Sequence, residues 1–136
     1  LLIQKEEKRR LYQIIDEEGE EGFKAIENRV NASIETEDTV IATGGSVVYC
    51  SEAMEHLKSI GKVVYLRLSL ESLEKRLGNL KKRGVLLKEG QTLKSLYEER
   101  VPLYEKYADI VVDEEGKDLE ASLQALLETL QKEINK

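Results

Sequence analysis

Apolar residues in the first part of the chain recur at the spacing of a helix. They form two stripes, one at Leu11, Ile14 and Ile15 and the other at Phe23, Ile26, Val30 and Ile34. Side chains three or four residues apart lie on one helix face, so the pattern predicts helical structure over residues 1–35. Gly19 lies between the stripes and is predicted to interrupt the helix.

Beyond residue 35, short apolar runs alternate with further helical stripes. The runs are rich in β-branched residues and predict strands at 39–43, 62–68 and 109–113. The stripes predict helices over 51–60, 69–77 and 117–135, with N-caps at Ser51 and Ser69, and a further helix that starts at Thr92. We expect Pro102, the only proline, to break or kink the helix that begins at Thr92.

This alternation of strands and helices is typical of an α/β protein with a mostly parallel sheet. The length of 136 residues suits a single domain over 1–136 with one hydrophobic core. The segment 78–90, GNLKKRGVLLKEG, is basic and framed by glycines. Its composition predicts a loop that carries a cluster of cations, where the resemblance described below places a lid.

The composition limits which classes of partner the protein can bind and indicates its cellular compartment. A net charge of −6, from 27 acidic and 21 basic residues, argues against binding to a nucleic-acid backbone. No apolar run is long enough to span a membrane, and no signal peptide is visible, so we expect no membrane partner. A single cysteine, Cys50, excludes an intrachain disulfide and suits a cytoplasmic protein. Neither Cys50 nor His56, which is predicted to be a surface or half-buried residue, has a pattern that suggests catalysis.

The stretch TVIATGGSVVY, residues 39–49, has two glycines where the predicted strand ends. Gly44 and Gly45 leave the backbone bare, and ligands of open α/β sheets bind at the carboxyl ends of strands. We therefore expect a ligand to approach the backbone here, although a plain strand-to-loop turn would have the same sequence.

Several segments, read in order, resemble the shikimate kinase family of small P-loop kinases. They are Gly19-Glu20 with Phe23-Lys24-Ala25-Ile26-Glu27, Val40-Ile41-Ala42-Thr43-Gly44-Gly45, Val63-Val64-Tyr65-Leu66, Arg76 with Arg83, Arg100-Val101-Pro102-Leu103-Tyr104, and Tyr107-Ala108-Asp109. The resemblance runs from the first residue to about Asp113. Each segment alone is a weak signal, but their order and spacing together are specific.

The resemblance implies a three-layer fold in which helices flank a parallel sheet of strand order 2-3-1-4-5. No G-x-x-x-x-G-K-[ST] motif occurs in the chain, and its opening residues, Leu1-Leu2-Ile3, include no initiator Met. We therefore expect the first two strands and the phosphate-binding loop to be missing from this chain, which would be the remainder of a longer product. The first strand would otherwise lie between the strands at 39–43 and 62–68.

The resemblance also implies roles for particular residues. The residues that would bind the acceptor substrate are Lys24, Glu27, Gly44, Gly45, Ser46 and Arg100. Arg83 would stabilise charge on the transferring phosphoryl group from the lid, and Arg76 would pack on the adenine ring. For Glu27, Arg76 and Arg100, a solvated position on a helix is the alternative. No metal ligand is expected in this chain.

Two residues depart from the family pattern. Lys24 stands where the family has an arginine, so the charge is kept but the bidentate geometry for a carboxylate is lost. Ser46 replaces a third glycine, and it would either narrow the site or add a hydroxyl donor.

The function implied is transfer of the γ-phosphoryl group of ATP, with Mg²⁺, to a hydroxyl of shikimate in aromatic amino acid biosynthesis. We expect the chain as given to be inactive or nearly so without its phosphate-binding loop. Two alternatives stay open: a kinase for another small hydroxy acid, and a non-catalytic relative that acts in binding or assembly.

Overall fold

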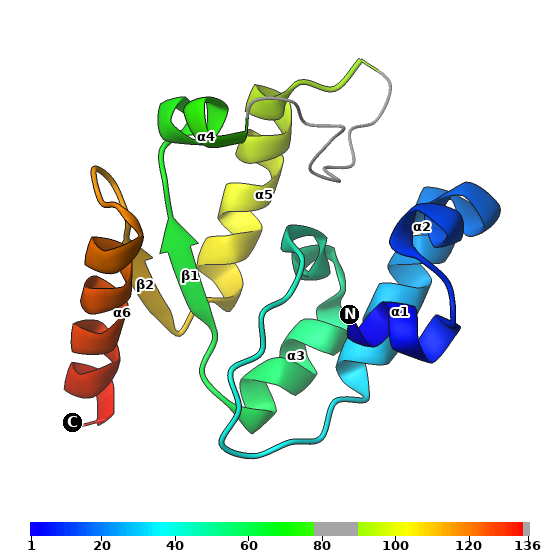
Figure 1. The fold of residues 1–136 in the computed structure, drawn as a ribbon, viewed down its shortest axis with the longest axis horizontal. Coiled ribbons are helices and arrows are strands. Elements are labelled where there is room, and N and C mark those ends of the chain that lie inside the picture. The colour runs from blue at the N-terminus through cyan, green and yellow to red at the C-terminus, as the bar shows by residue number, and fades with distance from the viewer. Residues whose placement is uncertain (78–89, 135–136) are drawn as a thin grey trace. The chain divides into compact units, whose positions relative to one another are not determined.

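The computed structural model describes residues 1–77 and 90–134, arranged in two compact units, 1–63 and 64–136 (Figure 1). The first unit contains α1 (Leu2–Glu7), α2 (Leu11–Ala32), the 3₁₀ helix η1 (Gly45–Tyr49) and α3 (Ser51–Ile60). The second contains β1 (Val64–Arg67), α4 (Leu70–Leu77), α5 (Leu93–Tyr107), β2 (Ile110–Asp113) and α6 (Leu119–Ile134). The single domain over 1–136 stays a prediction.

The core of the first unit forms where α2, η1 and α3 pack together. Its buried side chains come from all three helices: Ile14, Phe23, Val30, Val47, Val48, Ala53, Met54 and Leu57. The members on α2 belong to the apolar stripes of the sequence. Gly19 interrupts α2 as predicted, with a φ of 73° that residues with a side chain rarely adopt.

The strand predicted at 39–43 is not present, which corrects the sequence-based expectation. Residues 34–44 are irregular, and Val40 is 95% exposed. A strand exists only where a neighbouring strand accepts its hydrogen bonds, and no described strand lies beside this segment. The glycines that follow therefore end an exposed, irregular segment rather than a buried strand.

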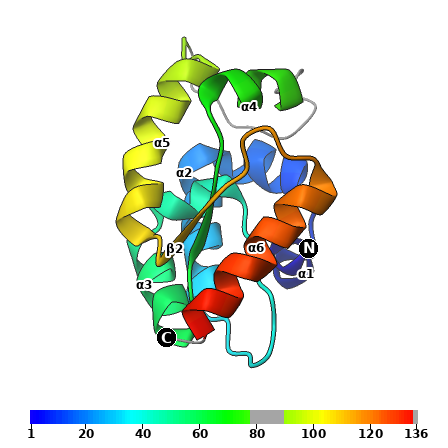
Figure 2. The same ribbon diagram turned by 90° about the vertical axis from the view of Figure 1, so that its left-hand side faces the viewer.

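The other two predicted strands are confirmed and form a parallel pair in the second unit. Their register runs from Val64 beside Ile110 to Arg67 beside Asp113. The chain between them includes α4 and α5, as a parallel connection requires. The ring of Tyr65 on β1 stacks on Tyr104 of α5 with 5.2 Å between the ring centroids. The views in Figures 1 and 2 place α6 alongside β2.

Of the two predicted helix caps, the one at Ser69 is confirmed, because its hydroxyl accepts a hydrogen bond from the Ser72 amide at 3.2 Å. The cap predicted at Ser51 was wrong by one residue, because α3 begins at Ser51 and its N-cap is Cys50, without a side-chain cap. Thr92, predicted to start a helix, is the N-cap of α5, and its hydroxyl accepts a hydrogen bond from the Ser95 amide at 3.1 Å. Helix α5 continues through Pro102 to Tyr107, so the proline does not break it, and a kink there stays a prediction.

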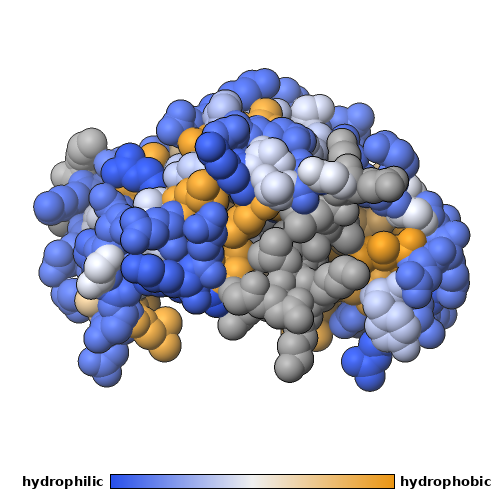
Figure 3. Space-filling model, turned by 90° about the horizontal axis from the view of Figure 1, so that it is seen from above, coloured by the Kyte–Doolittle hydropathy of each residue, from blue (hydrophilic) through white to orange (hydrophobic). Residues whose placement is uncertain are grey.

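The surface in Figure 3 is mostly hydrophilic outside the grey residues, with apolar groups between the charged side chains. The most exposed leucines of α6 are Leu119, Leu123 and Leu127, spaced four residues apart along one side of the helix. Among the described residues, no helix is both long and apolar enough to cross a membrane.

Candidate active site

The candidate site of the first unit is built on the second half of α2. Lys24 and Glu27 are three residues apart and so lie on neighbouring positions of one helix face. The side chains differ in exposure: Lys24 is exposed, whereas Glu27 is only 3% exposed. Burial of a carboxylate is costly unless hydrogen-bond donors surround it, so the contacts of Glu27 define the site.

The turn that begins at Gly44 packs against the carboxylate of Glu27. The Ser46 hydroxyl contacts both carboxylate oxygens, at 2.8 Å from Oε1 and 3.0 Å from Oε2. A Cβ added to Gly44 would lie 3.5 Å from Oε2 of Glu27, which is ordinary van der Waals contact. The turn is closed by the Val47 amide, which donates to the Gly44 carbonyl at 3.3 Å. Two segments far apart in sequence therefore meet at this buried carboxylate.

Further contacts hold η1 and α3 on α2 and so fix this geometry. The Asn28 side-chain oxygen accepts a hydrogen bond from the Ala53 amide at 3.0 Å. The Cys50 thiol lies 3.7 Å from the Lys24 carbonyl and is buried. The ammonium of Lys24 lies 5.6 Å from the centroid of the Tyr49 ring, a cation–π distance.

The electrostatics of the site keep Cys50 protonated. Burial, and to a smaller extent the nearby charge of Glu27, raise the pKa of the Cys50 thiol to about 11, while Lys24 opposes the shift. A thiol with this pKa is a poor nucleophile. His56 is half-buried as predicted, with Nε2 2.6 Å from the Ile34 carbonyl oxygen.

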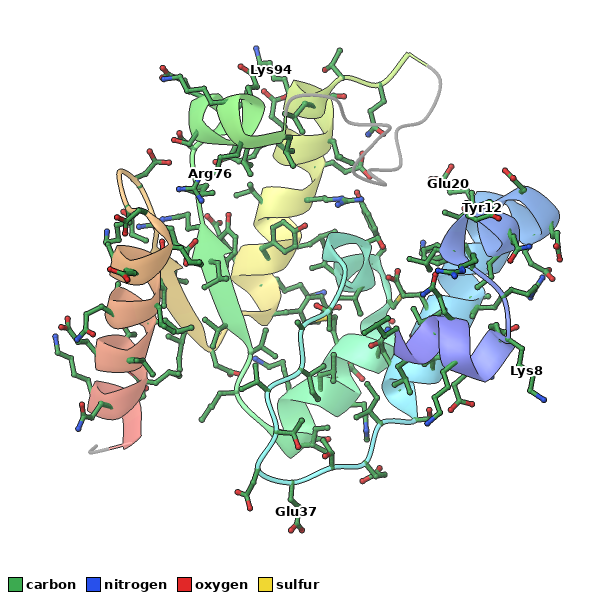
Figure 4. All side chains as sticks on the ribbon, in the orientation of Figure 1. Lys8, Tyr12, Glu20, Glu37, Arg76 and Lys94 are labelled. Carbon is green, nitrogen blue, oxygen red and sulfur yellow. The ribbon has the colours of Figure 1, made fainter. Side chains whose placement is uncertain are left out.

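The remaining predicted site residues belong to the second unit or lie outside the described residues. Arg76 is on α4, and its Nη2 donates a hydrogen bond to the Lys117 carbonyl at 3.0 Å. Figure 4 shows its side chain directed from α4 toward the segment that precedes α6. Arg100 is half-buried on α5. Arg83 and most of the predicted lid, 78–89, lie outside the described residues.

Of the predicted acceptor-site residues, the structure brings Glu27, Gly44 and Ser46 into contact, with Lys24 on the adjacent turn of α2 and Gly45 at the start of η1. Sequence reasoning missed Asn28 and Tyr49. The position of Asn28, next to Glu27 on the helix, was a weak signal for its role. No sequence pattern could have paired Tyr49 with Lys24, because their contact depends on how η1 packs on α2.

The described residues do not fit the metal that the resemblance implies. Among residues 1–77 and 90–134, no group of three or more His, Cys, Asp or Glu side chains is arranged to hold a metal ion. The sequence also has no Walker A motif to bind the phosphates of ATP.

The fold is that of small-molecule kinases of the P-loop type, as comparison with solved structures shows. Shikimate kinase from Acinetobacter baumannii in complex with shikimate matches with a TM-score of 0.78 and 30% identity, over 98% of this chain and 75% of that one. Shikimate kinase from Aquifex aeolicus matches with a TM-score of 0.76 and 33% identity, over 97% and 78%.

The sequence comparisons name the family. The family model "Shikimate kinase" matches residues 1–131. A shikimate kinase of Dictyoglomus turgidum is 36% identical over 94% of this chain, and one of Francisella tularensis subsp. novicida is 41% identical over 76%. The chain spans 77% of the first relative's length and 61% of the second's. The chain belongs to the shikimate kinase family, whose members use ATP.

Proposed function

We propose that this chain carries the acceptor side of a shikimate kinase, which transfers the γ-phosphoryl group of ATP to a hydroxyl of shikimate. The observation that carries the proposal is the buried carboxylate of Glu27, held by Ser46 beside the bare backbone of Gly44. Family membership supports the reaction, and a structurally similar relative is known in complex with shikimate.

In this proposal each residue of the site has a distinct task. Glu27 accepts a hydrogen bond from a hydroxyl of the acceptor and so orients it, while the backbone near Gly44 approaches the ring without steric hindrance. Lys24 binds the acceptor carboxylate as a point charge. Arg100, in the second unit, keeps the role that the family resemblance implies for it, a planar fork for a carboxylate. These tasks are positioning and charge neutralisation, which dominate phosphoryl transfer.

Binding of the nucleotide depends on residues other than those around Glu27. ATP would supply the γ-phosphoryl group, and we assign Arg76 to its adenine and Arg83 to the charge of the transferring group. Because no Walker A sequence occurs in the 136 residues, we expect acceptor binding by this chain without turnover.

A second candidate is a kinase for a different small hydroxy acid. Lys24 motivates it, because its ammonium lies over the Tyr49 ring and cannot offer the two parallel hydrogen bonds of an arginine. Ser46 adds a hydroxyl at the floor of the site. A panel of cyclic and open-chain hydroxy acids, compared with shikimate in the same assay, separates the two candidates.

The test is titration calorimetry of this chain with shikimate, together with ADP release in the presence of MgATP. We expect binding without ADP release, and a loss of affinity of at least tenfold in Glu27→Gln. Glu20→Gln is the matched control, because Glu20 is exposed on the same helix (Figure 4). Equal binding by both variants would contradict the role of Glu27, and ADP release at a normal rate would contradict the predicted inactivity.

A further inference from the structure

Helix α2 consists of two halves, 11–18 and 20–32, that meet at Gly19. The φ of 73° and ψ of −178° at Gly19 are not helical values, so the direction of the helix can change at this residue. Lys24 and Glu27 lie on the second half. The angle between the halves therefore decides where these residues of the candidate site lie relative to the first half, and side-chain contacts across the interruption are needed to fix it.

Ion pairs connect the two halves across this interruption. Arg9, in the linker between α1 and α2, contacts two residues of the first half through Nη1, Glu17 at 2.7 Å and Glu18 at 3.2 Å. Its Nη2 lies 3.0 Å from Oε2 of Glu7 on α1. The other carboxylate oxygen of Glu7, Oε1, pairs with Arg29 on the second half. Glu7 and Arg9 thus form a continuous chain of charges from one half to the other.

The carboxylate of Glu7 is the central member of this chain of charges. Its side chain is 16% exposed and that of Arg9 is 23% exposed. Charges that are shielded from solvent in this way and joined in a network contribute more than an isolated exposed pair.

The two halves also approach each other directly beside the interruption. A Cβ added to Gly22, on the second half, would lie only 2.7 Å from Cβ of Glu18 on the first half. A side chain at position 22 would push the halves apart, so the observed angle depends on glycine at that position.

We propose that Glu7, Arg9 and Arg29 form a latch that holds the two halves of α2 at the observed angle, and that Gly19 is the joint that moves when the latch opens. When the pair between Glu7 and Arg29 breaks, the second half loses its connection to α1 and moves together with the candidate-site residues that it carries. Because the paired groups are only partly buried, salt weakens the latch.

The first test is proteolysis with an enzyme that cuts after glutamate, with initial rates measured by mass spectrometry of the fragments. Cleavage after Glu20, which is exposed directly beyond the joint (Figure 4), requires local opening of α2. Cleavage after Glu55 on α3 reports opening elsewhere in the same unit. The ratio of the two rates therefore isolates the joint.

We expect Glu7→Gln to raise this ratio about threefold, as the loss of one partly shielded ion pair implies. Glu6→Gln is the matched control, because Glu6 is exposed on the same helix and its substitution removes the same charge. Arg29→Gln should raise the ratio by a similar factor. The double variant, Glu7→Gln with Arg29→Gln, should raise it little further, because both substitutions remove the same interaction.

The second test repeats the proteolysis in 1 M NaCl, where charges are screened within about 3 Å. The ratio for the unsubstituted chain should rise toward that of Glu7→Gln at low salt. The ratio for Glu7→Gln itself should stay nearly constant, because its latch is already open. The salt dependence is thus specific to the intact latch, and rates after Glu55 correct for any effect of salt on the protease.

Three results would overturn the proposal. Equal ratios in Glu7→Gln and Glu6→Gln would mean that the ion pair does not hold the joint. A rise of about ninefold in the double variant would mean that Glu7 and Arg29 act independently. Faster cleavage after Glu55 and Glu20 alike in Glu7→Gln would mean that the whole unit has loosened. None of these measurements requires shikimate, so their outcome is independent of the proposed function.

Discussion

The hydrogen bonds from Ser46 to Glu27 allow a quantitative test of how the site is held together. Ser46→Ala removes a donor that contacts both oxygens of a carboxylate that is 3% exposed. A hydrogen bond to a charged group contributes about 1.5–3 kcal/mol, and burial this deep leaves little solvent screening. We therefore expect Ser46→Ala to lower the free energy of unfolding by about 2 kcal/mol.

The assay is urea unfolding followed by far-UV circular dichroism. With a slope of about 2 kcal/mol per molar urea, the midpoint should fall by about 1 M. Ser33→Ala is the matched control, because its hydroxyl donates to the neutral Val30 carbonyl at 2.7 Å and should contribute about 1 kcal/mol.

A double-mutant cycle isolates the contribution of the charge. Glu27→Gln keeps an acceptor for Ser46 but removes the negative charge, so Ser46→Ala should cost only about 1 kcal/mol in that background. If Ser46→Ala costs the same in both backgrounds and no more than Ser33→Ala, the hydroxyl does not stabilise a buried carboxylate and the reasoning is refuted.

Three further predictions follow from other parts of the structure. Alkylation of Cys50 at pH 8 should be about 100-fold slower in the folded chain than in urea. The reason is that a pKa raised from 9.0 to about 11 lowers the thiolate fraction by about that factor. Equal rates in the two states would contradict the raised pKa. Hydrogen bonds from the Ser69 amide and the Ser72 hydroxyl lower the pKa of Glu115 below its ordinary 4.5, so the stability that they add is present above pH 4.5 and is lost as the pH falls through the lowered pKa. Glu115→Gln should therefore be less stable than the unsubstituted chain at pH 7, and the gap in urea midpoint should narrow as the pH falls below 4.5. A gap independent of pH would refute this. Pro102→Ala should stabilise α5 by about 1–3 kcal/mol, because an exposed proline inside a helix lacks an amide donor. A lower urea midpoint in this variant would contradict that reasoning.

The features that sequence reasoning predicted correctly are those that depend on nearby residues. The cap at Ser69 is a hydrogen bond to an amide three residues away, and the interruption of α2 at Gly19 depends on the conformational freedom of that residue alone. The strands around Tyr65 and Val111 were also predicted, because a dense β-branched run is strongly biased toward extended structure.

Sequence alone therefore determined the described α-helices, two of the three expected strands and, through its ordered motifs, the shikimate kinase family. Tertiary structure decided the rest. Residues 39–43 have the composition of a strand, yet a strand requires a partner to accept its hydrogen bonds, and no described strand lies beside them. The burial of Glu27 and its contacts with Ser46 likewise arise only when η1 packs on α2, because residues 19 positions apart meet through the packing of a shared core.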